Sequence, residues 1–386
     1  MANRIVLNET SYFGAGAISV IVQEVIDRQF KKAFVVTDKG LIKFNVAQKV
    51  TKVLENAGIP YEIYDNVKPN PTIENVLTGV KAYASSRADF ILAIGGGSTI
   101  DTAKGIGIVT NNPEFADVKS LEGVASTKFK SVPIIAVPTT AGTAAEVTIN
   151  YVITDEDAVK KMVCVDPKDI PIIAVVDPEM MVSMPKGLTA ATGMDALTHA
   201  IEGYTTKGAW VMTDMFELKA MELIAKNLPK AVAEPKNIEA RDGMATASYI
   251  AGMGFSNVGL GIVHSMAHQL GAVYDTPHGV ANALLLPYVM EYNAQATGEK
   301  FRDIARQMGV ENVDNMTKDE YRKAAIDAVI KLSKSIGIPQ KLIEIGAKEA
   351  DLNKLAKMAF NDVCTPGNPR DTNIEEILEI YKKAFK

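Results

Sequence analysis

The first half of the chain alternates short apolar runs with longer stretches of helical periodicity. Most of these runs are apolar throughout, as expected for parallel strands that are covered on both faces. The stretches between them are long enough for the crossover helices that parallel strands require. We therefore predict an α/β domain with a doubly wound, mostly parallel, Rossmann-like sheet. The predicted strands are 4–7, 33–38, 61–65, 90–94, 132–137 and 172–176.

The second half of the chain has a different pattern. From about Pro185 onward strand-like runs become rare, and segments rich in Ala, Met, Lys and Glu carry helical periodicity to the C-terminus. A chain of 386 residues is long enough for two domains with cores of their own. We expect the α/β domain to span residues 1–185 and an all-helical domain to span 186–386.

Charge and cysteine content narrow the setting in which the protein works. A net charge of −5 and a pI near 5.6 argue against nucleic acid or an anionic membrane as a partner. Two cysteines without a pairing pattern indicate a reduced, cytoplasmic setting. The first residues do not have the pattern of a signal peptide, and the apolar runs are far shorter than the roughly 20 residues of a membrane-spanning helix. We expect a soluble protein with a small-molecule ligand.

All four histidines of the chain lie in one stretch that begins at Asp195. Asp195 and His199 are spaced by four residues, and so are His264 and His268, which places each pair on one helix face about 6 Å apart along the axis. His278 follows in a turn-like Pro-His-Gly sequence. A carboxylate with several imidazoles suits Fe(II), Zn(II), Mn(II) or Co(II) alike. The stretch therefore predicts a metal site without selecting the metal.

These histidines have two other interpretations. The segment from His264 to His268 has the spacing of a zinc peptidase motif, but Ser265 stands where that motif needs a glutamate as general base. A set of unrelated core or surface histidines is the second alternative, and the two helical pairs argue against it.

Two loops of small residues follow predicted strands. The first is Gly95-Gly-Gly-Ser98, which precedes a predicted helix, and the second runs from Pro138 to Glu146 and contains three threonines. Glycines let the backbone approach a pyrophosphate, and a helix N-terminus offers free N–H groups. Open α/β sheets bind ligands at this end of their strands, which favours a nucleotide. Neither loop matches GxGxxG or Walker A, so a tight turn and an irregular crossover are the alternatives.

Two single residues have a functional and a structural interpretation. Asp38 ends a predicted strand, where its carboxylate could bind both ribose hydroxyls and would repel a 2′-phosphate, favouring NAD over NADP. It could equally cap the next helix. Cys364 lies in a polar, turn-rich loop, and a small buried side chain is the alternative to a functional role.

These motifs, in this order, resemble the iron-containing (group III) alcohol dehydrogenase family over essentially the whole chain. The resemblance implies an NAD-binding domain over 1–185, a metal-binding domain over 186–386, and a homodimer. The segments that carry it are Gly95–Ser98, Asn111–Asp117, Ala141–Tyr151, Gly193–His199, Gly252–Gly259, His264–His268 and Pro277–Gly279.

The resemblance also assigns roles to residues. It implies Fe(II), with Zn(II) as an inactive or less active substitute, bound by Asp195, His199, His264 and His278. It leaves His268 near the nicotinamide as a catalytic residue. The implied NAD contacts are Asp38, Asn70, Gly97, Ser98, Thr139, Thr140, Thr143 and Lys161. The implied substrate pocket contains Asn150, Phe255 and Cys364.

The expected activity is reversible hydride transfer between NAD and a short primary alcohol or diol. The lactaldehyde and propane-1,2-diol pair is favoured, with ethanol or butanol next. Ser265 and Gln269 differ from the residues of the family members that act on lactaldehyde, and Gln269 is more similar to the ethanol dehydrogenases of the same family. Tyr288 stands in place of a common histidine. These three positions leave the preferred alcohol open. His268 has a suitable intrinsic pKa for the proton relay. The alternatives are an enzyme of the glycerol dehydrogenase or dehydroquinate synthase type and a non-catalytic NAD-binding protein.

Overall fold

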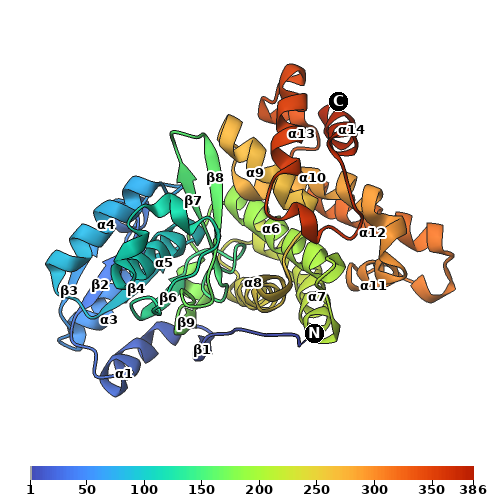
Figure 1. Ribbon diagram of the computed structural model, residues 1–386. Helices are drawn as coiled ribbons and strands as arrows, with labels where there is room; N and C mark the ends of the chain where they lie inside the picture. Colours follow the sequence, from blue (N-terminus) through green and yellow to red (C-terminus); the bar gives the residue numbers. More distant parts are fainter. Residues whose placement is uncertain (1) are drawn as a thin grey trace. The chain divides into compact units, whose positions relative to one another are not determined.

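The computed structural model describes residues 2–386, and its first half is built on a six-stranded sheet (Figure 1). The strands are all parallel, in the order β1-β9-β6-β4-β2-β3. The continuous apolar runs of β2, β4, β6 and β9 are buried over their whole length, as strands covered on both faces must be. The strands are β1 (Thr10–Phe13), β2 (Ala33–Val36), β3 (Tyr61–Tyr64), β4 (Phe90–Gly95), β6 (Ile134–Pro138) and β9 (Ile173–Val176).

Helices cover both faces of this sheet, which confirms the doubly wound α/β prediction. Phe34 and Val35 are neighbours on β2 but belong to different cores. The core of Val35 includes α1 and α3, whereas that of Phe34 includes α4 and α5. The helices are α1 (Val20–Asp27), α2 (Lys39–Lys43), α3 (Ala47–Asn56), α4 (Ile73–Ser86) and α5 (Gly97–Asn111).

Two features of this half differ from the sequence prediction. The segment 4–7 is not a strand; the strand that pairs with β9 is β1, with Thr10 opposite Ile173. A second, three-stranded sheet in the order β5-β8-β7 was not predicted. Its antiparallel hairpin is formed by β7 (Asn150–Asp155) and β8 (Lys160–Val165), and β5 (Gly123–Val124) runs parallel to β8.

The chain divides into two compact units, of which the first ends at Met184 and the second runs from Pro185 to Lys386. The described residues of the second unit contain helices and no strand, which confirms the helical prediction. α6 is buried on almost every side between Thr189 and Thr205. The helices are α6 (Lys186–Thr205), α7 (Val211–Ala233), α8 (Ile238–Val258), α9 (Ile262–Tyr274), α10 (His278–Asn293), α11 (Lys300–Gln307), α12 (Lys318–Ser335), α13 (Leu352–Phe360) and α14 (Ile374–Phe385).

Short 3-10 helices complete the described secondary structure. Among residues 2–386, no helix has both the length and the apolar character needed to cross a bilayer. The 3-10 helices are η1 (Ala17–Ser19), η2 (Pro113–Phe115), η3 (Val118–Leu121), η4 (Pro178–Met180), η5 (Ala294–Thr297), η6 (Val313–Asn315), η7 (Leu342–Ile345), η8 (Glu349–Asp351) and η9 (Thr365–Gly367).

Candidate metal centre

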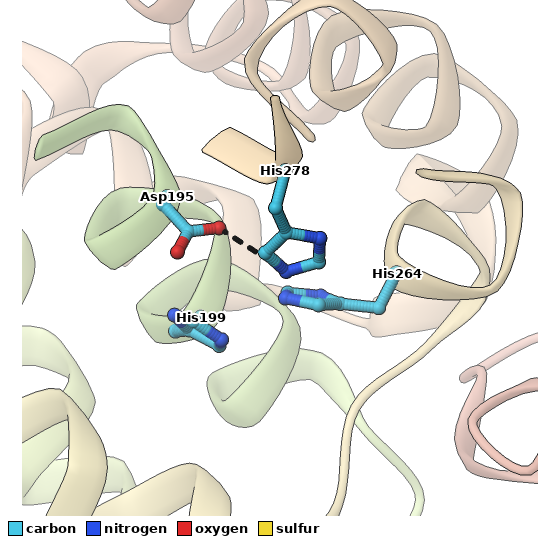
Figure 2. A group of neighbouring side chains, drawn as sticks. All are labelled: Asp195, His199, His264 and His278. Carbon is cyan, nitrogen blue, oxygen red and sulfur yellow. Dashed lines mark ion pairs between the residues drawn. The ribbon is translucent and has the colours of Figure 1, made fainter. Parts of the chain in front are cut away.

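Three helices of the second unit bring four candidate metal donors together (Figure 2). Asp195 and His199 lie one turn apart on α6, His264 lies in the first turn of α9, and His278 is the first residue of α10. One donor atom from each side chain lies within 4.8 Å of the others, and Nε2 of His278 is 3.6 Å from Oδ1 of Asp195. This donor set fits a divalent first-row ion.

Glycine allows the helix ends to approach closely enough for this cluster. A Cβ at Gly279, in the first turn of α10, would lie 2.3 Å from the carbonyl oxygen of Ala191 on α6. A Cβ at Gly193, also on α6, would lie 2.2 Å from Leu228 of α7. A larger residue at Gly279 would push α10 away from the α6 backbone that carries Asp195, whereas one at Gly193 would require the Leu228 side chain to move.

Burial sets the protonation state of His264, one of the four donors. His264 is 2% exposed, and burial, with a further contribution from the nearby His268, lowers the pKa of His264 well below 6.5. The imidazole is therefore neutral at physiological pH, which is the form that binds a metal. Its Nδ1 lies 2.5 Å from Oε2 of Glu202, and burial raises the pKa of Glu202 to about 7.

Two buried residues that contact the donors were missed by the sequence analysis. Glu202 lies on the same face of α6 as Asp195, two turns later, so the spacing could have identified it. Asn282 lies one turn after His278 on α10. Its Nδ2 is 2.7 Å from Oδ1 of Asp195 and 3.1 Å from Nε2 of both His264 and His278. Nothing in the sequence distinguishes this asparagine from a surface polar residue.

His268 lies beside the four clustered donors and belongs to a second group with Asp362 and Cys364. Its ring is stacked on that of His278, with centroids 5.5 Å apart. Nδ1 of His268 is 2.9 Å from Oδ2 of Asp362. Cys364 is half-buried, and burial raises the pKa of its thiol well above the usual value.

The residues predicted to line a substrate pocket lie in different surroundings. Phe255, on α8, is stacked on His199 with ring centroids 4.1 Å apart. Cys364 lies in the turn that also contains Asp362. Asn150 begins β7 in the first unit, where its carbonyl oxygen accepts a hydrogen bond from Nζ of the buried Lys104 at 2.8 Å. The structure thus places Phe255 against the metal cluster and Cys364 near His268.

In the first unit, the loop Gly95–Ser98 (the glycine loop) and the loop Pro138–Glu146 (the threonine loop) are in contact. They follow the neighbouring strands β4 and β6, and the backbone N–H of Thr139 donates to the carbonyl oxygen of Gly95 at 3.0 Å. A Cβ at Gly97 would lie 2.8 Å from Oγ1 of Thr143, and one at Gly96 would lie 3.1 Å from Oγ1 of Thr140. A side chain at Gly97 would therefore force the loops apart, and one at Gly96 would fit only tightly.

Gly97 and Ser98 form the first turn of α5, and no side chain caps this helix. Its first N–H groups therefore remain available to an anion. The Ser98 hydroxyl donates to the carbonyl oxygen of Pro69. The neighbouring Asn70 accepts a hydrogen bond from Nζ of Lys161, on β8, at 3.0 Å. The structure thus joins two more of the predicted NAD contacts.

Asp38 also has the helix-capping role that the sequence offered as the alternative to ribose binding. Its Oδ1 accepts the backbone N–H of Leu41 at 2.9 Å and so caps α2. Asp38 follows β2, which pairs directly with β4, so it lies at the same edge of the sheet as the glycine loop.

Comparison with known proteins gives matches over nearly the whole chain. The family profile described as "Iron-containing alcohol dehydrogenase" matches residues 8–178, and "Fe-containing alcohol dehydrogenase family, C-terminal" matches 189–385. The chain is 57% identical over 385 residues to lactaldehyde reductase of Escherichia coli (strain K12), covering 100% of both chains. It is 43% identical to the NAD-dependent methanol dehydrogenase of Bacillus methanolicus, covering 97% of this chain and 98% of that one. The crystal structure of a 1,3-propanediol oxidoreductase, 44% identical, has a TM-score of 0.96 with 100% of both chains covered.

Proposed function

Because this chain belongs to the iron-containing alcohol dehydrogenase family, we propose that it transfers hydride reversibly between a short primary alcohol or diol and NAD, with Fe(II) as its metal. The family and the named relatives make it an oxidoreductase that acts on alcohols and aldehydes. The observation that carries the proposal is the gathering of Asp195, His199, His264 and His278, by three helices, into one cluster in which all but His278 are buried.

The metal-binding role of the helical unit rests on the chemistry of these four donors. One carboxylate oxygen and three imidazole nitrogens suit Fe(II), and Zn(II) is a possible substitute. Glu202 and Asn282 keep donor atoms oriented, as outer partners of metal-binding residues commonly do. When bound, the ion polarises the oxygen of the alcohol or aldehyde, and the nicotinamide carries the hydride.

The NAD-binding role of the α/β unit rests on its two small-residue loops. The first N–H groups of α5, with Gly97 and Ser98, suit the pyrophosphate, and the hydroxyls of Thr139, Thr140 and Thr143 suit phosphate or ribose oxygens. Asn70 and Lys161 add a hydrogen-bonded pair to this set. The carboxylate of Asp38, which caps α2 through Oδ1, would repel the 2′-phosphate of NADP and so favours NAD.

The proton that leaves or joins the substrate oxygen is assigned to His268. It lies one turn from His264 and stacks on His278, so a proton can be held beside the cluster without occupying a donor. The proposed substrate contacts are Phe255 and Cys364 of the helical unit and, considered separately, Asn150 of the α/β unit. Phe255 packs on His199 and excludes water from that side of the cluster.

The favoured substrate pair is lactaldehyde and propane-1,2-diol, with ethanol or butanol next. The support is the 57% identity to a protein named lactaldehyde reductase. Homodimers in the cytoplasm complete the proposal; both cysteines are free, in keeping with a reduced compartment. Light scattering during gel filtration measures the oligomer directly.

An anaerobic assay tests the activity. Protein stripped of metal is reloaded with Fe(II) or Zn(II) and incubated with propane-1,2-diol, ethanol or butanol, and with NAD or NADP. The absorbance of the reduced cofactor is followed. We expect the highest rate with Fe(II), NAD and propane-1,2-diol. Equal turnover before and after complete metal removal, or no reduced cofactor with any of the alcohols, contradicts the proposal.

A further inference from the structure

His268 has a buried carboxylate partner that the proposed chemistry does not yet use. The histidine is 5% exposed, and its Nδ1 lies 2.9 Å from Oδ2 of Asp362. Asp362 lies 94 residues further along the chain, in the turn that follows α13. The contact therefore ties α9 to a segment that supplies none of the four clustered donors.

Hydrogen-bond donors hold this carboxylate from several sides. Oδ1 of Asp362 accepts the backbone N–H of Cys364 at 3.0 Å. Oδ2 also accepts Nε2 of Gln269 at 3.3 Å, and that nitrogen donates in addition to the carbonyl oxygen of Ser265 at 2.9 Å. A carboxyl group whose two oxygens both accept is best satisfied in its ionised form. Burial acts to raise the pKa of Asp362, but the interaction with His268 and the hydrogen bonds from Cys364 together lower that pKa below its usual value.

Of the two nitrogens of His268, Nδ1 is committed by this contact. An ionised carboxylate only accepts, so Nδ1 must carry a proton, and Nε2 is the nitrogen left to take up or release one. The other titratable groups near His268 are His264 on α9, His278 on α10, Glu202 on α6 and Cys364. Within this set, Asp362 is the group that hydrogen-bonds the ring of His268.

We propose that Asp362 is the positioning residue of His268: it accepts the proton on Nδ1, fixes the ring, and keeps Nε2 available for proton exchange with the substrate oxygen. This inference rests on the proposed role of His268. The same three side chains, His268, Asp362 and Cys364, could instead gather a second cation. A raised thiol pKa and an Nδ1 already within hydrogen-bond distance of a carboxylate favour the pair without a cation.

The test uses Asp362→Asn in the metal-loaded enzyme. Without the carboxylate, no group that can only accept fixes the proton on Nδ1 of His268, so the pH profile of kcat/KM for alcohol oxidation should differ from that of the parent enzyme. The value of kcat should fall about 10- to 100-fold, by analogy with other buried carboxylate–histidine partners. Metal content should stay at one ion per chain, and KM for NAD should not change. Asp362→Glu, which keeps the carboxylate, should recover part of the rate.

The matched control is Asp351→Asn. Asp351, the last residue of η8, accepts a hydrogen bond from the hydroxyl of Tyr274 on α9 at 2.6 Å, so the control removes a carboxylate that is bonded to the same helix as His268 without touching His268. Its pH profile should match that of the parent enzyme. His268→Ala separates the proposed role of His268 from that of Asp362. Adding Asp362→Asn to His268→Ala should cause no further loss of activity.

Each result decides a point. If His268→Ala keeps the parental kcat, the role of His268 is wrong, and with it that of Asp362. If His268→Ala loses activity while Asp362→Asn keeps the parental rate and pH profile, only the inference about Asp362 fails. A second metal ion per chain that Asp362→Asn abolishes would identify a cation site instead. If both Asp362 variants fail to fold, as judged by their helical circular dichroism, Asp362 is a residue of the fold and the inference is overturned.

Discussion

The candidate sites of the two units differ in how far they depend on side chains and how far on backbone. In the helical unit, long side chains such as Asp195 and His264 converge from buried helices. In the α/β unit, the proposed nucleotide site combines hydroxyl side chains with closely packed backbone, since a Cβ at Gly97 would lie 2.8 Å from Oγ1 of Thr143. The donor cluster should lose its function when one donor side chain is removed. Closely packed backbone should be disturbed when one atom is added to it. Substitutions in each unit can therefore test whether the two sites respond differently to the removal and to the addition of atoms.

Removal of a donor should have the largest effect. We expect His264→Ala to lose its metal after anaerobic reconstitution and to show turnover no higher than background, because three donors remain where four converge. Its affinity for NAD should stay at the parental value, since the proposed NAD contacts lie in the other unit. Metal analysis, turnover and NAD titration measure these outcomes. Tyr274→Phe, at the far end of α9, is the control, and full activity in His264→Ala would refute the ligand assignment.

Addition of one methyl group should produce the opposite pattern. In Gly97→Ala the new Cβ would lie 2.8 Å from the Thr143 side chain, and overpacking of this kind costs about 1–3 kcal/mol. We expect NAD to bind up to about 100-fold more weakly, while metal content remains at one ion per chain. Gly187→Ala is the matched control because a Cβ there meets nothing within 4 Å. Unchanged NAD binding in Gly97→Ala would remove the glycine loop from the nucleotide site.

The difference between the units also explains what the sequence could predict. The pair Asp195 and His199 is local, so helical spacing alone is enough to identify it. Glu202 follows the same spacing and could have been found. Asp362 could not, because its contact with His268 spans 94 residues and depends on how α9 and the turn after α13 pack.

In the α/β unit the strands were predicted well where burial made them uniformly apolar. The strand predicted at 4–7 was wrong, because a run of four residues carries too little periodicity to identify a strand. The backbone N–H groups that donate to the carbonyl oxygen of Ile172 are those of Glu9 and Thr10. The β7–β8 hairpin was missed, although β7 alternates buried and half-buried residues as a strand should. Contact between the two loops depends on the pairing of β4 with β6, which local sequence does not specify.

Removal of an outer partner should weaken the metal site without destroying it. Both oxygens of Glu202 accept hydrogen bonds, Oε1 from the backbone N–H of Val263 at 2.7 Å and Oε2 from the N–H of His264 at 3.4 Å, with Nδ1 of His264 at 2.5 Å. In Glu202→Gln the amide NH2 must face one of these donors. We expect metal affinity to fall about 10-fold, measured by competition with a chelator. An affinity equal to that of the parent would show that His264 needs no such support.

Glu146 offers the smallest and most selective contrast. Burial raises the pKa of both Glu146 and Glu202 to about 7, yet Glu146 ends the threonine loop of the α/β unit. Because its folded pKa lies above the ordinary 4.5, the folded state binds more protons, and stability must fall as the pH rises from about 4.5 to about 7. A shift of this size corresponds to about 3 kcal/mol at most. Glu146→Gln cannot ionise, so its urea midpoint should exceed that of the parent at pH 8 but not at pH 4, while metal affinity stays unchanged. The exposed Glu311→Gln is the control. If Glu146→Gln instead weakened metal binding as Glu202→Gln is expected to, the site of the α/β unit and that of the helical unit would not be independent of each other.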